Sequence, residues 1–230
     1  MTTLDAAVLD DPFGCALRGR HARFARAHGS AIAYRRDVSV FYAHPRELTG
    51  DDYADLATLA GPGGTVGLRG RSTPLPTGWD ALETFELVLY TGEAVEPAAD
   101  PEFVALTGDD VPEMTALVDL TRPGPFLPRT IELGDYLGYR DPGTGRLLAM
   151  AGERAKPDGW TEISAVCTHP DARGRGLARR LIAAVADGIV ARGDLPFLHT
   201  TADNPARALY ESMGFVHRAT VPLEIVRVPR

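Results

Sequence analysis

The sequence predicts a mixed α/β protein in which helices flank a mostly antiparallel mixed sheet. Short runs rich in β-branched and aromatic residues alternate with turn residues through most of the 230 residues. The sequence DPGTG at 141–145 separates two such runs and predicts a hairpin. Two helices are predicted late in the chain, over 177–191 and 204–213. Strands joined by hairpins, with late helices, favour a sheet covered by helices.

The chain is expected to divide at residues 93–101 (EAVEPAADP), where prolines, small residues and acids are typical of a linker. We expect a smaller N-terminal α+β domain over 1–97 and a second domain over 98–230. In the first domain strands are predicted at 31–34, 38–43, 65–69 and 85–90, and helices at 17–27 and 51–60. In the second, strands are predicted at 103–106, 136–140, 147–153, 160–168, 196–200, 215–218 and 223–228, and an early helix from Asp109 or Asp110 to Thr121.

Composition excludes several classes of protein. The net charge is −7 and the pI about 5.4, whereas non-specific nucleic-acid binding needs a surplus of Lys and Arg. No apolar run reaches the roughly 18 residues of a membrane span, and the first residues lack the basic stretch of a secretory signal. Cys15 and Cys167 have no metal-ligand spacing and are expected to be reduced thiols. We therefore expect a cytoplasmic protein with no metal, nucleic-acid or membrane partner.

The segment over 161–181 (TEISAVCTHPDARGRGLARRL) carries the chemistry. A predicted strand leads into a loop rich in glycine and arginine, and a helix begins near Gly176. Such a turn leaves backbone N–H groups free at the positive end of a helix dipole, which suits a phosphate or diphosphate. Gly174 and Gly176 allow close approach of an anion, and Arg173, Arg175, Arg179 and Arg180 add positive charge.

Other phosphate-binding loops fit this segment less well. No Gly-Lys-Ser/Thr follows, as a Walker A sequence requires, and the residue three past Gly176 is Arg179 instead of the glycine of a dinucleotide loop. An arginine-glycine contact with RNA is a weaker alternative, because the loop is short and the protein is acidic.

The residues do match another signature. Arg173, Gly176 and Ala178 fit the pattern Arg/Gln-x-x-Gly-x-Gly/Ala of the GNAT N-acetyltransferases. Residues 204–215 (NPARALYESMGF) resemble the Asn…Tyr-x-x-x-Gly-Phe end of that fold, although the alanine between them is out of register. The order of predicted elements over 102–228 is similar to GNAT order, and ISAVCTHPDARGRGLA is especially similar to the FR47-like branch, which also includes domains related to glycine N-acyltransferases.

The resemblance implies a GNAT fold in which the pantetheine arm of acetyl-CoA lies between two diverging strands, 160–168 and 196–200. Backbone groups near Val166 and Thr168 would pair with the arm. The diphosphate would lie on the amides from Gly174 to Ala178, and the Val166 amide would polarise the thioester. The residues that would contact the cosubstrate are Val166, Cys167, Thr168, Arg173, Gly174, Arg175, Gly176, Leu177, Ala178 and Asn204.

The resemblance also implies two proton-transfer groups. Tyr210, six residues past Asn204, matches the tyrosine that protonates the CoA sulfur, and Glu162 matches a strand glutamate that acts as base through water. Each residue has an alternative role: Glu162 as a solvated strand residue, Tyr210 as a packed aromatic. Asn204 is in either case a helix N-cap. His169 and His199 are expected to be loop or strand-end residues.

The predicted function is acetyl-CoA-dependent N-acetylation of a small or amino-acid-like amine, by a monomer or homodimer. The alternatives are a protein N-terminal or longer-chain acyltransferase and an acyl-CoA-binding sensor without turnover. The N-terminal half resembles the extra half that precedes the catalytic domain in FR47-like proteins. We expect it to pack on the catalytic sheet and help enclose the acceptor. The proline-rich loop at 121–130, with Arg122, either shapes the acceptor pocket or is a rigid connection.

Overall fold

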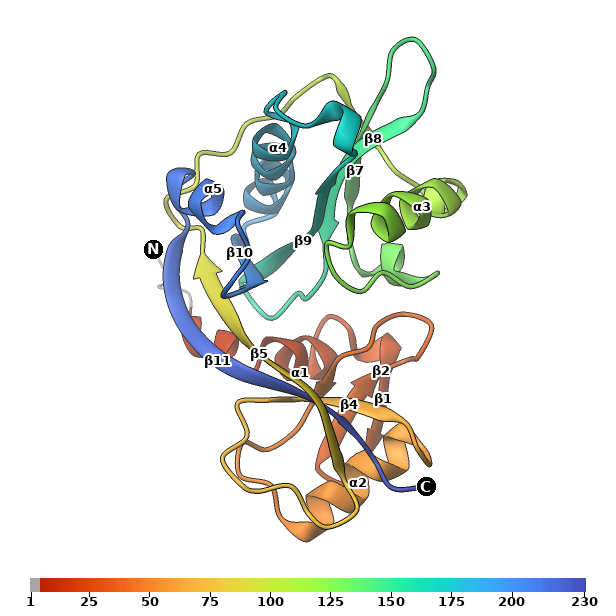
Figure 1. Cartoon of the computed structure of the whole chain (residues 1–230). Coiled ribbons are helices and arrows are strands. Elements are labelled where there is room, and N and C mark those ends of the chain that lie inside the picture. Colours follow the sequence, from red (N-terminus) through yellow and green to blue (C-terminus); the bar gives the residue numbers. More distant parts are fainter. Residues whose placement is uncertain (1–4) are drawn as a thin grey trace.

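Within residues 5–230, which the computed structural model describes, eight strands form one sheet in the order β4-β11-β5-β10-β9-β8-β7-β6 (Figure 1). β9 and β10 are parallel, and the other neighbouring strands are antiparallel, so the predicted mixed, mostly antiparallel sheet is confirmed. The start of the chain was expected not to be a secretory signal, and its first four residues lie outside the described residues. The strands are β4 (Thr65–Arg69), β5 (Asp80–Thr91), β6 (Phe103–Ala105), β7 (Tyr136–Arg140), β8 (Leu147–Glu153), β9 (Trp160–Thr168), β10 (Leu195–Thr201) and β11 (Val216–Arg227).

Two long strands, β5 and β11, run through both halves of the molecule (Figure 1). Each has 12 residues, and they pair antiparallel from Val216↔Thr91 to Arg227↔Asp80. The two short strands predicted over 215–218 and 223–228 are therefore one strand. β5 precedes the predicted linker, yet it lies between β10 and β11 in the sheet. The expected boundary at residue 97 therefore does not separate two sheets, because strands from both sides of it belong to the same sheet.

The N-terminal segment forms a small three-stranded sheet with a helix packed on it. The helix predicted over 17–27 is wrong, because α1 ends at Arg18 and residues 25–28 form a strand that pairs with the next through a turn at Gly29. Gly29 has φ 51°, which a tight hairpin turn needs and glycine adopts without strain. The elements are η1 (Ala6–Asp10), α1 (Pro12–Arg18), η2 (Ala22–Phe24), β1 (Ala25–His28), β2 (Ala31–Tyr34), β3 (Tyr42–Ala43) and α2 (Gly50–Ala60).

Two longer helices pack on opposite faces of β8 and β9, on either side of these strands in Figure 1. α4 coincides with the predicted helix and buries Leu177, Leu181, Val185 and Ile189 against the sheet. α3 packs on the other face with Met150 and Cys167. The helical segments here are η3 (Gly108–Asp110), α3 (Val111–Thr121), η4 (Thr130–Leu133), η5 (Pro170–Ala172), α4 (Leu177–Ala191) and α5 (Arg207–Ser212). No helix within residues 5–230 is both long and apolar enough to cross a bilayer.

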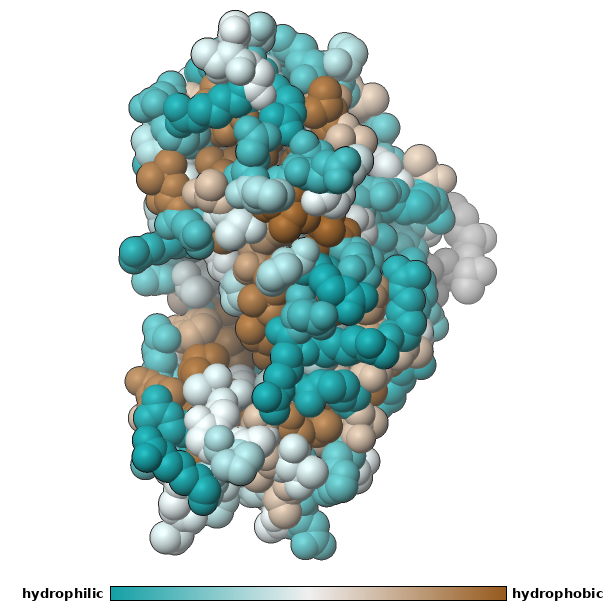
Figure 2. Space-filling view, turned by 90° about the vertical axis from the view of Figure 1, so that its right-hand side faces the viewer, coloured by the Kyte–Doolittle hydropathy of each residue, from teal (hydrophilic) through white to brown (hydrophobic). Residues whose placement is uncertain are grey.

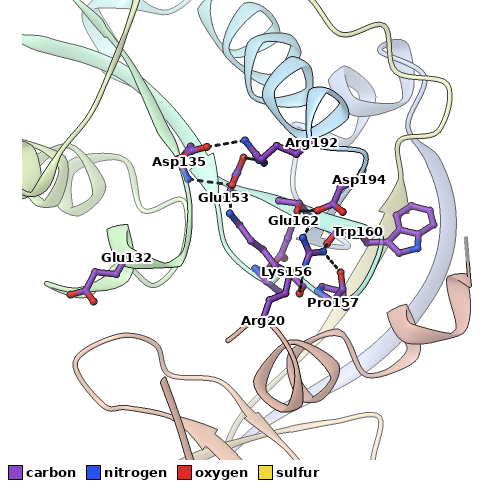
Figure 3. A network of polar contacts seen from close by, with 12 residues as sticks. Arg20, Glu132, Asp135, Glu153, Lys156, Pro157, Trp160, Glu162, Arg192 and Asp194 are labelled. Carbon is purple, nitrogen blue, oxygen red and sulfur yellow. Dashed lines mark hydrogen bonds and ion pairs between the residues drawn. The ribbon is translucent and has the colours of Figure 1, made fainter. Parts of the chain in front are cut away.

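A polar network fixes the connection between β8 and β9, which carries a residue of the site described below (Figure 3). Arg20 donates to the carboxylate of Asp194 at 2.7 Å and to the carbonyl oxygens of Pro157 and Trp160. Other members of the network include the buried Glu153, which pairs with Lys156 at 2.6 Å and with Arg192. The N-terminal segment is in this way attached to the sheet beside the point where β9 begins.

Candidate active site

A cavity of about 1090 Å³ lies where β9 and β10 separate. The two strands pair only through Leu195↔Trp160, Pro196↔Thr161 and Phe197↔Glu162. Beyond these pairs, residues 163–168 and 198–201 line the cavity instead of continuing the ladder. Figure 2 shows the molecule hollowed between its two halves, with apolar surface in the hollow. The divergence expected from the family resemblance is therefore present.

A β-bulge in β9 accompanies this separation. β8 pairs Met150 with Cys167 and Gly152 with Ser164, so that Ala165 and Val166 together face a single residue of β8. Ala165 has φ 53°, an uncommon conformation for a residue with a Cβ. Bulges of this kind bend a strand and increase its twist, and strained backbone is often retained at functional sites.

The turn between β9 and α4 presents a row of unsatisfied donors. The six backbone N–H groups from Gly174 to Arg179 have no hydrogen-bond acceptor among residues 5–230. Gly174 and Gly176 have φ 76° and 72°, and a Cβ at either position would meet open space. The glycines are therefore needed for the left-handed backbone of the turn. Consecutive free amides at a helix N-terminus are able to bind an anion, which is the role that the sequence analysis predicts for this turn.

The arginines around this turn differ in what they contact. Arg173 lines the cavity, and its side chain donates to the Thr168 carbonyl oxygen at 3.4 Å. Arg175 donates to the Tyr139 hydroxyl at 2.7 Å and lies over that ring. Arg180 is paired with carboxylates that precede β6. Among the arginines around this turn, Arg173 is thus the one that lines the cavity.

The structure brings most of the predicted contact residues to one place. The cavity wall includes Val166, Cys167, Thr168, Arg173, Asn204 and Tyr210. Gly174, Arg175, Gly176, Leu177 and Ala178 form the adjoining turn and the start of α4. Burial raises the pKa of the Cys167 thiol to about 11, so this cysteine stays protonated. Among residues 5–230 no cluster of three His, Cys, Asp or Glu side chains has metal-binding geometry.

Tyr210 lies on α5, which begins at Arg207, later than predicted. Asn204 still acts as a cap, because its Oδ1 accepts from the Ala206 amide at 2.8 Å. The Tyr210 side chain packs against Phe215 and lines the cavity with 8% of its surface exposed. Burial raises its pKa, so the phenol keeps its proton at neutral pH and is able to donate it.

Glu162 is not a solvated residue, because none of its surface is exposed. Arg154 donates to both carboxylate oxygens, with Nε 2.8 Å from Oε2, and His199 Nδ1 lies 2.8 Å from Oε1. Burial opposes ionisation, but the charge and hydrogen bonds of Arg154, aided by His199, outweigh it and hold the pKa of Glu162 well below its ordinary value. This carboxylate has little affinity for a proton.

His199 is a residue whose importance the sequence does not show. It lies on β10, two residues past the last pair with β9, and is one of the residues that line the cavity, with its side chain 3% exposed. Its ring is stacked with Phe13 of α1. Burial lowers the pKa of His199, against the opposing effect of Glu162. Arg154 and Glu162 are eight residues apart in sequence, but the third member of the cluster comes from a different strand.

The N-terminal half supplies one wall of the cavity, as expected. Phe13, Tyr34 and Phe41 line it, together with residues of β4. The proline-rich loop contributes as well, through residues 121–125. The lining contains one acidic residue, Asp203, and the arginines Arg26, Arg36, Arg69, Arg122, Arg154 and Arg173.

Comparison with known proteins decides the family. Residues 136–222 match the family FR47-like protein. The whole chain resembles the crystal structure of a protein from Novosphingobium aromaticivorans DSM 12444 that is assigned to the GNAT acetyltransferases. The TM-score is 0.86 and the sequence identity 36%, over 96% of this chain and 99% of the other. This chain belongs to the GNAT family.

The GNAT fold also recurs in more distant structures. A GCN5-related N-acetyltransferase from Kribbella flavida has a TM-score of 0.63 at 17% identity, over 99% of this chain and 97% of its own. A GCN5-related N-acetyltransferase-like protein from Streptococcus suis 89/1591 has a TM-score of 0.58 at 15% identity, over 94% and 93%. No curated protein sequence matches this chain significantly. As a GNAT protein the chain is an acyltransferase whose acyl donor is an acyl-CoA.

The buried ion pair predicts a pH-dependent loss of stability. Arg154→Met leaves the Glu162 carboxylate buried without its cation, and we expect the free energy of unfolding to fall by about 3–5 kcal/mol near neutral pH. In wild type the pair stabilises the fold above the unfolded-state pKa of roughly 4.3, and this stabilisation is lost as pH falls. In the variant, burial raises the pKa of Glu162, so the difference between the proteins should shrink in acid. Urea denaturation at a series of pH values measures it.

Arg18→Met is the matched control, because it removes an exposed ion pair with Asp11. Such pairs contribute about 0–1 kcal/mol. If Arg154→Met were as stable as Arg18→Met at every pH, the buried pair would not hold the site together.

Proposed function

We propose that this GNAT protein transfers the acetyl group of acetyl-CoA to the amine of a small, amino-acid-like acceptor. The observation that carries the proposal is the cavity itself, because it extends from Arg173, the residue directly before the free amides after β9, to the protonated Tyr210. A thioester held in this cavity by its diphosphate would have a proton donor near its sulfur and space for an acceptor beyond it.

The cavity wall suits the pantetheine arm of CoA. Thr168 Oγ1 and Thr200 Oγ1, on the two diverging strands, are buried and have no hydrogen-bond partner among the described residues. Both residues line the cavity. Buried polar atoms are normally paired, and the arm carries amide groups that could satisfy them. Arg173 and the amides from Gly174 to Ala178 would hold the diphosphate.

The chemistry needs activation at both ends of the bond that breaks. The amine nitrogen attacks the thioester carbonyl carbon directly, and the electron pair of the C–S bond passes to sulfur. The Val166 amide would stabilise charge on the carbonyl oxygen. Tyr210 would protonate the departing sulfur, since its buried phenol is un-ionised at neutral pH. Glu162 belongs to the machinery that receives the proton of the amine.

The charge of the cavity supports an acceptor that carries an acid group. Five of the six lining arginines have no carboxylate partner among residues 5–230, and Arg154 is the one that does. Arg26 and Arg36 both donate to the Leu59 carbonyl oxygen, at 3.0 and 3.3 Å, which brings two guanidinium groups together. The Nε of Arg69 is buried and has no hydrogen-bond partner in the described part of the chain. In a chain of net charge −7, this concentration of unpaired cations favours an anionic ligand.

Tyr210→Phe tests the role of the hydroxyl. We expect kcat for thiol release from acetyl-CoA, over a panel of amines, to fall about 10²–10⁴-fold, because the sulfur would leave unprotonated. CoA affinity by calorimetry should stay unchanged. Tyr53→Phe is the control, since its hydroxyl donates to the Pro74 carbonyl oxygen and does not line the cavity. Unchanged turnover in Tyr210→Phe removes this residue from the mechanism, and a wild type that binds CoA but releases no thiol is a sensor.

Paired acceptors test the acid group. We expect L-amino acids to react with kcat/KM at least about tenfold higher than their amides, because a charge-assisted hydrogen bond contributes roughly 1.5–3 kcal/mol. Amidation also makes the amine less basic, so a larger fraction of it is neutral at pH 7, and this effect alone would make the amide react faster. A preference for the free amino acid therefore has to come from recognition of its carboxylate. Equal rates, or a preference for peptide N-termini, would contradict an amino-acid-like acceptor and favour a protein N-terminal acetyltransferase.

A further inference from the structure

We propose that His199 is the catalytic base, and that Glu162 positions and polarises it instead of accepting the proton itself. The inference rests on the proposed function, since it assigns a residue to the amine end of that reaction. It follows from three observations: the partner of one ring nitrogen, the lack of a partner for the other among the described residues, and the place of His199 in the cavity lining.

The partner of Nδ1 fixes the tautomer. Glu162 is ionised and can only accept hydrogen bonds, so the His199 Nδ1 that lies 2.8 Å from its Oε1 must carry the proton. A neutral imidazole with its proton on Nδ1 has a lone pair on Nε2. Arg154 holds Glu162 in place from the opposite side, with Nε 2.8 Å from Oε2.

The second ring nitrogen has no partner. His199 Nε2 is buried and makes no hydrogen bond within residues 5–230, and His199 is one of the residues that line the cavity. If the ring had only a packing role between Phe13 and Phe197, this nitrogen would remain desolvated and unpaired, which proteins usually avoid. An amine bound in the cavity supplies the missing donor.

Burial keeps the ring neutral, because it lowers the pKa of His199. Glu162 on β9 opposes this effect and favours a positive imidazole, whereas Arg69 on β4 and Arg154 after β8 disfavour it to a smaller extent. Tyr34 on β2, which also lines the cavity, stays un-ionised because burial raises its pKa. A neutral His199 at physiological pH is able to take a proton at once.

The proton balance of the reaction is closed by two residues. As the amine nitrogen bonds to the carbonyl carbon, Nε2 of His199 accepts one of its protons and becomes imidazolium, which Glu162 stabilises. The C–S bond breaks, and the sulfur takes the proton of Tyr210. Transfer of the proton from imidazolium to the Tyr210 phenolate through cavity water then restores both residues. The products are the amide and free CoA.

The experiment compares His199→Gln, Glu162→Gln and a matched control in the full-length protein, with the amine that wild type acetylates fastest. We expect His199→Gln to lose about 10²–10⁴-fold in kcat/KM and to lose the acid limb of the pH profile, which in wild type lies below the ordinary histidine value of roughly 6.5. Glu162→Gln should retain part of the activity, with its acid limb moved to lower pH, because the carboxylate no longer raises the pKa of the imidazole. CoA affinity, measured by calorimetry, should be unchanged in both.

The control is His28→Gln, an exposed histidine of β1 outside the cavity, which should keep wild-type kinetics. Nitrogen-15 NMR of the wild-type imidazole gives an independent result that does not depend on any acceptor: the proton of His199 should be on Nδ1. A folded His199→Gln variant with wild-type rate and pH profile, or a ring protonated on Nε2, would overturn the inference while leaving the proposed function intact. If wild type released no thiol with any amine, the proposed function would fail and this assignment with it.

Discussion

The carboxylate of Glu162 connects three segments of the chain at the point where the sheet opens. It lies in the last residue pair between β9 and β10, receives Arg154 from the β8–β9 connection and bonds His199 from β10. A buried charge is costly unless its hydrogen bonds are satisfied, and here both oxygens are. Arg154 is in turn covered by Phe41, whose ring lies 4.6 Å from its guanidinium carbon. Backbone pairing stops at this cluster, and side chains continue the link between the strands.

The opened sheet needs a cover, and the N-terminal half provides it. β5 and β11 carry the sheet from one half into the other, so the small sheet and α2 are fixed relative to the cavity (Figure 1). Arg20 attaches the N-terminal segment to the β8–β9 connection (Figure 3). The part of the chain in which the sequence shows no chemistry thus forms one wall of the cavity and gives it positive charge.

Elements defined by local patterns were predictable from the sequence. β4, β7, β8, β9 and α4 match their predicted bounds, because their apolar periodicity and flanking glycines are local signals. The glycine-rich turn and Tyr210 were predictable through a family pattern. Residues 17–27 were predicted as a helix, a segment whose alanines and arginines suit one, and the hairpin with β2 overrides that preference.

The remaining site residues could not be predicted, because long-range pairing brings them together. In the sequence His199 resembles any histidine near a strand end. Only the folded position of β10 places it beside Glu162. Arg36 and Arg69 reach the cavity only through the small sheet and β4. A sequence identifies Glu162 as a candidate carboxylate but does not show that its oxygens are already occupied, which changes its role from accepting a proton to holding a base.

The central claim is that the turn after β9 binds the diphosphate of CoA and so directs the thioester into the cavity. Amide chemical shifts of the labelled full-length protein, recorded during titration with CoA and separately with pantetheine, test it most directly. CoA should move the backbone resonances from Gly174 to Arg179, whose N–H groups have no acceptor among the described residues, whereas pantetheine, which lacks the diphosphate, should leave them in place. If saturating CoA left those six amides unmoved, the account of this site would be wrong.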